Sequence, residues 1–475
     1  MNKLLPFLLR RAVLMALSIA ALSHAAANTA PAQSLPASNP GAARLKRTLT
    51  GHTKSLIEIV FSPDGETIAT GSEDGTVRLW DARTGHERAT LRLTNKKPHT
   101  LLITWSPDSR WLATRWYHGL DRTTEASIWD ARNGSLLSTL AGHGASLNHI
   151  EWSPDGQTVL TASDDGTAKL WDGAPSWQLR RTIEYQQVDV SRDTSSILAA
   201  AFTRKKMRAP RNIIARFAAG GRTVVVSSSN KLPQLWSIDG ELIAPLFTRA
   251  EEIAQSNSSY PSHAAPLISP DGRFIATTDD GDGTRLRDAR TGKARHTLPD
   301  ESAHIFTPDG RTLITASWEK KAGSGFFDLP QVVLKLWDVE TGALQEVWRE
   351  SMSGINRIYS SPAGGESFVV VGAGSMKARV IDAQTGRLKA KLPYESCTES
   401  LFSVSGCEPF IFNADGRVML RLTGALKLFD AGTGQQFAAL DDTHRRAAFS
   451  PVDVRLLAAR SKDRKSLLLF EVAAR

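Results

Sequence analysis

Short apolar runs separated by tight turns are the repeating feature of this chain, and residues 51–91 show it most clearly. Four strand-like runs occur there, at residues 56–62, 67–71, 77–81 and 88–91. The turns between them contain glycine, which supplies the positive φ that tight turns need. In the first run Ile57 and Ile59 alternate with Leu56 and Val60, so apolar residues fall on both faces. Since a sheet with one wet face shows clean alternation, we expect a small antiparallel sheet that is covered on both sides.

Two signals from this stretch recur along the chain and interleave strictly. The turn signal reads FSPDG at 61, WSPDS at 105, WSPDG at 152, FAAGG at 217, ISPDG at 268, FTPDG at 306, SSPAGG at 360, FNADG at 412 and FSPVD at 449. The second signal, built around an aromatic-Asp pair, reads LWDARTG at 79, IWDARNG at 128, LWDG at 170, LWSIDG at 235, LRDARTG at 286, LWDVETG at 336, VIDAQTG at 380, LFDAGTG at 428 and LFEV at 469. Their spacing of roughly 40 to 60 residues is the period of a propeller blade.

The best-formed repeats carry a Gly-His pair before the first strand and a Trp-Asp pair at the end of the third. Gly-His at 51–52 goes with Trp-Asp at 80–81, and the same pairs recur at 142–143 and 171–172. This pattern resembles the signature of the WD40 family, and the resemblance covers residues 44–475. It implies an all-β protein, a single closed propeller of four-stranded antiparallel blades.

The repeats number nine, and the chain ends suggest how the ring closes. If each unit has strands A to D, the last unit at 446–472 supplies only three, and residues 45–50 form an unpaired strand at the other end. Pairing the two removes both open edges, which would otherwise invite aggregation. Because typical propellers have four to eight blades, eight blades is the alternative, in which a degenerate unit such as 212–246 or 408–440 is not a blade.

The resemblance also implies a buried hydrogen-bond chain of His, Ser or Thr, Asp and Trp within a blade. The matching residues are His52, Ser72, Asp74 and Trp80, and again His143, Ser163, Asp165 and Trp171. We interpret them as structural rather than catalytic, because the set recurs with the repeat and buried Asp and His need hydrogen-bond partners. Other units replace the Trp, with Arg287, Ile381, Phe429 and Phe470.

The start of the chain has the layout of a secretory signal peptide. Lys3, Arg10 and Arg11 precede an apolar run at 12–22 and then small residues, so we expect a signal peptide over 1–27. The apolar run is too short to span a bilayer. Residues 28–43 are rich in Ala, Pro and Ser and are expected to be a disordered spacer. The sequence therefore predicts export to the periplasm or the extracellular space.

Charge and cysteine content add little to this picture. The formal net charge of +9 falls to about +6 without the leader, which is mild for 475 residues. Export argues against nucleic acid as the partner of a basic chain, so we expect protein partners. Only two cysteines occur, Cys397 and Cys407, both in one insertion. An oxidising compartment would favour a disulfide between them, but ten residues of separation does not establish proximity, and the alternative of two unpaired cysteines stays open.

The long insertions between repeats predict where a partner binds. In a four-stranded meander the A–B and C–D connections lie on one face of the ring, and the B–C and D–A connections on the other. The long insertions all belong to the second group: 115–127 and 318–332 (B–C), and 184–211, 248–262 and 393–406 (D–A). Repeat proteins often carry insertions on the binding face. We therefore expect a partner on the B–C/D–A face, with these candidate residues: Trp116, Tyr117, Arg204, Lys205, Lys206, Trp318, Phe326 and Phe327.

An enzyme is the alternative interpretation, namely a hydrolase or lyase with a site at the mouth of the central channel. No convergent set of catalytic residues is visible, and there is no haem-attachment motif or nucleophile elbow. The acidic turn at 279–282 could hold Ca²⁺, but Asp-Asp-Gly is how these units make the B–C turn. The sequence predicts a non-enzymatic scaffold with no metal and no cofactor.

Overall fold

The structure of the protein is a computed structural model. It describes these residues, which all lie in the unit that runs from Pro40 to Arg475: 43–92, 100–117, 124–185, 213–228, 231–246, 265–279, 283–298, 302–319, 331–351, 355–362, 367–372, 378–392, 410–422, 426–440 and 443–473. The fold below is that of this unit.

Strands dominate the described residues and form nine four-stranded sheets, which we number as blades 1 to 9 in chain order. Blade 1 contains β2 (Leu56–Phe61), β3 (Thr67–Ser72), β4 (Thr76–Asp81) and β5 (Glu87–Arg92). Blade 2 contains β6 (Thr100–Trp105), β7 (Trp111–Tyr117), β8 (Ala126–Asp130) and β9 (Leu136–Leu140). Blade 3 contains β10 (Leu147–Trp152), β11 (Thr158–Ser163), β12 (Thr167–Asp172) and β13 (Leu179–Glu184).

The middle blades repeat this order. Blade 4 contains β14 (Ile214–Ala218), the 3₁₀ turn η2 (Ala219–Gly221), β15 (Thr223–Ser228), β16 (Lys231–Ser237) and β17 (Leu242–Pro245). Blade 5 contains β18 (Leu267–Ile268), β19 (Phe274–Asp279), β20 (Gly283–Asp288) and β21 (Ala294–Leu298). Blade 6 contains β22 (Ser302–Phe306), β23 (Thr312–Glu319), β24 (Gln331–Asp338) and β25 (Leu344–Ser351).

The last three blades complete the set. Blade 7 contains β26 (Ile355–Ser360), β27 (Ser367–Gly372), β28 (Ala378–Asp382) and β29 (Leu388–Leu392). Blade 8 contains β30 (Phe410–Phe412), β31 (Val418–Arg421), β32 (Leu426–Asp430) and β33 (Gln436–Leu440). Blade 9 contains β34 (Thr443–Phe449), β35 (Leu456–Ser461), β36 (Leu467–Val472) and the first strand of the chain, β1 (Ala43–Leu49).

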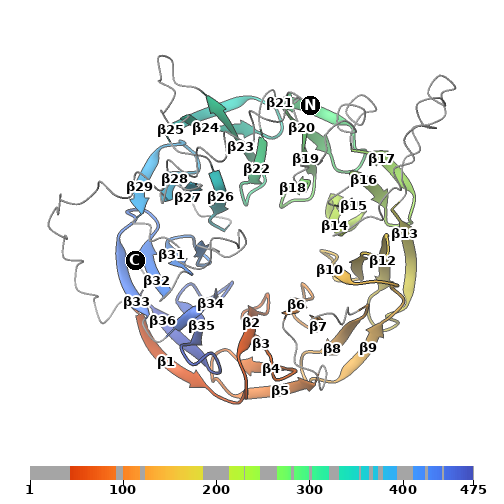
Figure 1. Cartoon of the computed structure of the whole chain (residues 1–475), viewed down its shortest axis with the longest axis vertical. Helices are drawn as coiled ribbons and strands as arrows, with labels where there is room; N and C mark the ends of the chain where they lie inside the picture. The colour runs from red at the N-terminus through yellow and green to blue at the C-terminus, as the bar shows by residue number, and fades with distance from the viewer. Residues whose placement is uncertain are drawn as a thin grey trace, which may run out of the picture. The chain divides into compact units, whose positions relative to one another are not determined.

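The nine blades form a ring, with strand A of each blade at the centre and strand D at the rim (Figure 1). The count of nine holds because the two degenerate stretches, 212–246 and 408–440, each contain a four-stranded sheet. The fold is thus an all-β, nine-bladed propeller.

Hydrophobic packing between neighbouring blades holds the ring together. In the described residues, nine buried clusters occur, one at each junction between consecutive blades. Each inner strand therefore packs on both faces, and β3, β11 and β27 are buried at all six positions. This explains why these runs do not alternate between apolar and polar residues.

Blade 9 joins the two ends of the chain. Strand β1 pairs antiparallel with β36, from Ala43 opposite Val472 to Leu49 opposite Leu467. Leu49 and Leu467 then share a buried cluster with Trp80 of blade 1. As a result β1 covers the edge that β36 would otherwise leave open.

Within the residues that the structure describes, no helix has the length and apolar character that crossing a membrane requires.

Candidate functional site

The connections between strands differ sharply between the two faces of the ring. Every A–B and C–D connection has four to six residues between its strands. The B–C and D–A connections are uneven, and the longest join β13 to β14, β17 to β18 and β29 to β30. One face is therefore built from uniform turns, and the insertions leave the blades from the other.

Most of the uniform turns share one hydrogen-bond pattern, which blade 1 shows, whereas the A–B turn of blade 4 is the 3₁₀ turn η2. In the A–B turn of blade 1, the Ser62 hydroxyl donates to Asp64, and the Asp64 carboxylate accepts from the N–H of Glu66. In the C–D turn, the Asp81 carboxylate accepts from the N–H and hydroxyl of Thr84. The pKa of Asp81 lies well below its ordinary value, because Arg88 donates to this carboxylate and Thr84 reinforces it. Turns of this kind hold Asp as an ionised structural acceptor.

Three predicted loop aromatics lie on strands, so the expected loops 115–127 and 318–332 are wrong at these ends. Trp116 and Tyr117 belong to β7 and pair with Leu101 and Thr100. Trp318 belongs to β23, opposite Val332. Aromatic and β-branched residues favour strands, and here they lengthen the B–C hairpins. The Trp116 side chain is partly buried and packs against the cluster between blades 1 and 2.

The other predicted binding residues lie outside the described residues. They are Arg204, Lys205, Lys206, Phe326 and Phe327. The same holds for Cys397 and Cys407, for the signal peptide at 1–27 and for most of the spacer at 28–43.

The hydrogen-bond chain of blade 1 runs through a threonine, and the expected Ser72 does not take this place. His52 Nδ1 lies 2.9 Å from Asp74 Oδ2, and His52 Nε2 lies 2.9 Å from Thr70 Oγ1. Trp80 Nε1 then donates to Thr70 Oγ1 at 2.8 Å. Ser72 instead donates to the carbonyl of Lys54 and accepts from the Asp74 N–H. Thr70 can bond to Trp80 because the two side chains lie on the same face of the sheet, on neighbouring strands.

Blade 3 repeats this chain through Thr161, with the same change from the expected Ser163. His143 lies 2.9 Å from Asp165 and 2.8 Å from Thr161, which accepts from Trp171 at 2.8 Å. Burial lowers the pKa of His143 below 6.5, and the hydrogen bond with Asp165 offsets only part of this effect. The pKa of Asp165 is also lowered, because hydrogen bonds from Thr167, Gly144 and His143 outweigh its burial. Neutral His beside ionised Asp is a structural arrangement here, since Trp and Thr close the set.

The Thr-to-Trp bond recurs where both residues are present. Trp129 donates to Thr114 at 2.9 Å in blade 2, and Trp337 donates to Thr315 at 2.8 Å in blade 6. In blade 5 the replacement Arg287 is buried and donates from Nε to Thr277 at 3.2 Å. A guanidinium thus takes the place of the indole and uses the same acceptor.

Blade 4 keeps the Trp but has lost the acceptor. Trp236 lies opposite Val224, so Val226 stands where blade 1 has Thr70. Trp236 Nε1 is buried and has no hydrogen-bond partner among the described residues. In blade 7 the positions of the threonine and the tryptophan are both occupied by apolar residues, Val370 and Ile381. This pair of side chains therefore contains no donor that needs an acceptor.

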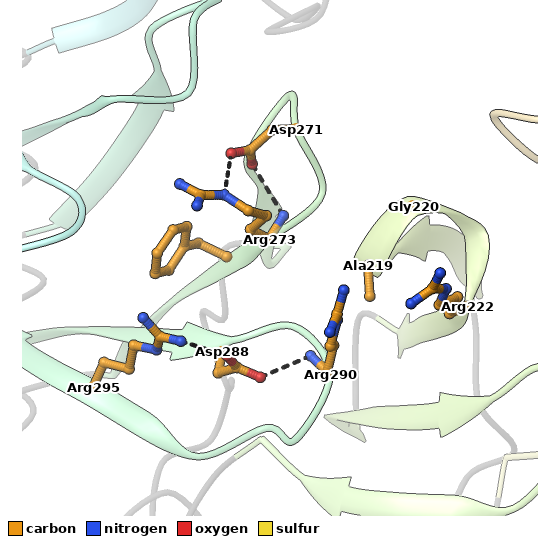
Figure 2. Close-up of a pocket in the computed structure, with 9 residues that line it drawn as sticks. Ala219, Gly220, Arg222, Asp271, Arg273, Asp288, Arg290 and Arg295 are labelled. Atoms are coloured by element: carbon orange, nitrogen blue, oxygen red, sulfur yellow. Dashed lines mark hydrogen bonds and ion pairs between the residues drawn. The ribbon is translucent and has the colours of Figure 1, made fainter.

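An arginine-lined hollow of about 440 Å³ lies between blades 4 and 5, on the face of the uniform turns. Figure 2 shows the side chains that line it. They come from the A–B turns of both blades and, in blade 5, from the C–D turn and strands β19, β20 and β21: Ala219, Gly220, Arg222, Asp271, Arg273, Phe274, Asp288, Arg290 and Arg295. The sequence does not single out these arginines, because the motifs that carry them recur in other blades and do not reveal which side chains converge.

The two A–B turns that form one wall of the hollow are locked together. The N–H of Ala219 donates to the carbonyl of Gly272 at 2.6 Å. Gly272 has a φ of +70°, and a Cβ there would lie 3.0 Å from the nitrogen of Gly220. The hollow is therefore preformed by backbone contacts.

No group of three or more His, Cys, Asp or Glu that could hold a metal ion occurs in the described part of the chain.

Comparison with known proteins finds a family model that matches two segments of the chain. The model named "WD domain, G-beta repeat" of the WD40 family matches residues 43–81 and 134–172. Each segment contains one complete His-Asp-Thr-Trp chain, that of blade 1 in the first segment and that of blade 3 in the second.

Two relatives and one solved structure show the extent of the similarity. The chain is 31% identical over 140 residues to a guanine nucleotide-binding protein subunit beta of Nicotiana tabacum, covering 28% of this chain and 36% of the relative. It is 33% identical over 138 residues to the nuclear distribution protein PAC1 of Arthroderma benhamiae, covering 27% of this chain and 29% of the relative. The chain thus spans about a third of the length of these relatives.

The solved structure is the crystal structure of the computationally designed Ika8 protein. Its TM-score is 0.50 at 16% identity, and the match covers 90% of this chain and 98% of the designed one. At this identity the likeness concerns the fold alone.

Proposed function

The chain belongs to the WD40-repeat family, and we propose that it is a non-enzymatic scaffold that binds a protein partner through the B–C/D–A face of its ring. The observation that carries this proposal is the contrast between the two sets of connections. Every A–B and C–D connection keeps four to six residues, whereas the connection from β13 to β14 alone runs from residue 185 to 213. Binding residues concentrate in loops that a rigid scaffold positions.

The described chemistry favours binding over catalysis. In each of the two His-Asp pairs the His is buried and the Asp is half-buried, and a Thr and a Trp complete the set. Their polar groups are thus occupied by structural hydrogen bonds. The tobacco relative is by name a subunit, that is, a part of a larger assembly, which supports a role in assembly for this chain as well.

We place the scaffold in the cell envelope, because residues 1–27 have the layout of a signal peptide. Mass spectrometry of the protein from its native host should find a mature N-terminus near Ala26 or Asn28. An intact Met1 on cytosolic protein would contradict the envelope location and would reopen nucleic acid as a partner.

The experiment for the binding face is a pull-down of the tagged mature protein from the host's envelope fraction, followed by affinity measurements. Phe326→Ala and Phe327→Ala should weaken binding of the partner by about 1 kcal/mol or more for at least one of them, the level of an interface hot spot. Reversing the charge of Lys205 and Lys206 should mainly slow association and change its salt dependence.

The matched control is a substitution in the uniform turns of the opposite face. Arg132→Ala changes an exposed C–D turn residue and should leave the affinity unchanged. A loss with Arg132→Ala but not with the loop variants would show that the face is wrongly assigned. Turnover of a small substrate, abolished by one His or Asp substitution, would make the protein an enzyme.

A further inference from the structure

A second hollow of similar build lies on the face of the uniform turns within the described residues, and it differs from the blade 4/5 hollow in its charge. The second, of about 520 Å³, lies between blades 9 and 1. Asp64, Asp81, Arg83 and Arg88 of blade 1 occupy the same turn and strand positions as Asp271, Asp288, Arg290 and Arg295 of blade 5. The blade 9/1 hollow is therefore an internal reference for the blade 4/5 hollow.

The two hollows differ in charge. The reference hollow is lined by equal numbers of both signs: Lys46, Arg47, Arg83 and Arg88 against Asp64, Glu66, Asp81 and Asp453. The blade 4/5 hollow is lined by four arginines and only two acids, Asp271 and Asp288. Part of this difference in charge arises at one position, where Glu66 of blade 1 corresponds to Arg273 of blade 5.

Two of the four arginines are already paired. Arg273 donates to Asp271 at 2.7 Å and also to Glu340 of blade 6. Arg295 donates to Asp288 at 2.9 Å and lies 3.7 Å from Glu340. Both guanidinium groups also lie 5.3 Å from the ring centre of Phe274. The carboxylates of Asp271, Asp288 and Glu340 therefore offset their positive charges.

Arg222 and Arg290 are the two arginines whose charge is not balanced. Within the described residues, neither side chain has a hydrogen bond or an ion pair, and both are exposed. They come from different blades, and Figure 2 shows them on either side of Ala219 at one wall of the hollow. A planar guanidinium binds a carboxylate through two parallel hydrogen bonds, so two such groups at one preformed hollow suit a ligand with more than one carboxylate.

We propose that the hollow between blades 4 and 5 binds an acidic peptide segment of a protein partner, with Arg222 and Arg290 holding its carboxylates. The volume exceeds what one carboxylate fills and falls within the range of ligand pockets. A nucleic-acid backbone fits less well, because it needs a continuous basic stripe, and Asp271, Asp288 and Glu340 interrupt the positive charge here. The hollow lies on the face opposite to the loop-rich one. The proposal for this site and the proposal for the loop face can therefore be refuted independently of each other.

The test uses the full chain and a fluorescein-labelled oligo-glutamate peptide, with fluorescence polarisation as the readout. The glutamate peptide should bind, and an oligo-glutamine peptide of the same length should not. Arg222→Gln and Arg290→Gln should each weaken binding about tenfold, since each removes charge-assisted hydrogen bonds. The affinity of the parent should also fall as salt is added.

Arg83→Gln is the matched control, because it removes the arginine at the position of Arg290 in the reference hollow. It should bind the glutamate peptide as tightly as the parent does. All three residues are exposed, so unchanged thermal melting is expected and confirms that each variant folds.

Three results would overturn the proposal. The first is equal binding of the glutamate and glutamine peptides. The second is an equal loss of affinity with Arg83→Gln and Arg290→Gln, which would mean general attraction to a basic surface. The third is binding of vesicles with anionic lipids through Arg222 and Arg290 without binding of the peptide, which would replace the protein partner by a membrane surface.

Discussion

A hydroxyl group placed at position 226 of blade 4 should not lower the free energy of unfolding, although a hydroxyl buried at most other sites would. Trp236 Nε1 is buried without a partner among the described residues, and Val226 stands where Thr70, Thr114, Thr161 and Thr315 accept this bond in other blades. Val226→Thr keeps the shape and the β-branch of the side chain. We therefore expect the new hydroxyl to accept the Trp236 N–H.

The expected change in the free energy of unfolding follows from a comparison with blade 7. Burying a hydroxyl without a partner costs about 1–3 kcal/mol in protein mutants, and this is the expected cost of Val370→Thr, which is equally buried but faces Ile381. At position 226 a hydrogen bond worth about 0.5–1.5 kcal/mol forms and an orphaned donor is relieved. Val226→Thr should therefore leave the free energy of unfolding unchanged or raise it by up to about 1 kcal/mol.

The assay is urea denaturation followed by tryptophan fluorescence, with midpoints compared among variants that share one slope. The difference between Val226→Thr and Val370→Thr isolates the bond to Trp236, and Thr70→Val should lower the midpoint as the reverse change. If Val226→Thr destabilises the protein as much as Val370→Thr does, the position of a hydroxyl opposite the indole is not what stabilises these blades.

Three further predictions concern the ring and its buried groups. Trp80→Ala should cost about 3–5 kcal/mol in urea denaturation, because it empties a large site in the cluster between blades 9 and 1; a midpoint like the parent's would contradict this. Deleting residues 44–50 should expose the edge of β36 and cause aggregation in light scattering, and a monodisperse variant would refute the role of β1 in closure. His143 has a lowered pKa, so its contribution to stability is complete above pH 6.5 and is lost as the pH falls below that value. His143→Gln should therefore flatten the fall of the urea midpoint between neutral pH and about pH 5, and an unchanged slope would show that His143 is not its source.

The recurring turn and Trp-Asp signals predicted the blades, nine by count with eight as the alternative, and the structure has nine. Each blade is a local meander whose turns depend on a few neighbouring residues, such as Asp64 with Ser62. Local signals of this kind are visible in sequence. The lengths of the connections were visible for the same reason, and with them the contrast between the two faces.

What only the tertiary structure decided depends on which side chains meet. Thr70, and not Ser72, links His52 to Trp80, because the register between β3 and β4 brings Thr70 beneath the indole. Trp116 was expected in a loop and lies on a strand that packs into the core.

The arginine hollow is the clearest case. Arg222 and Arg290 are separated by a whole blade in sequence and converge only because blades 4 and 5 stack side by side. The repeat by itself determined that turns of this kind line one face of the ring. The balance of charge at each junction depends on pairs of residues from different blades, and the stacking of the blades sets those pairs.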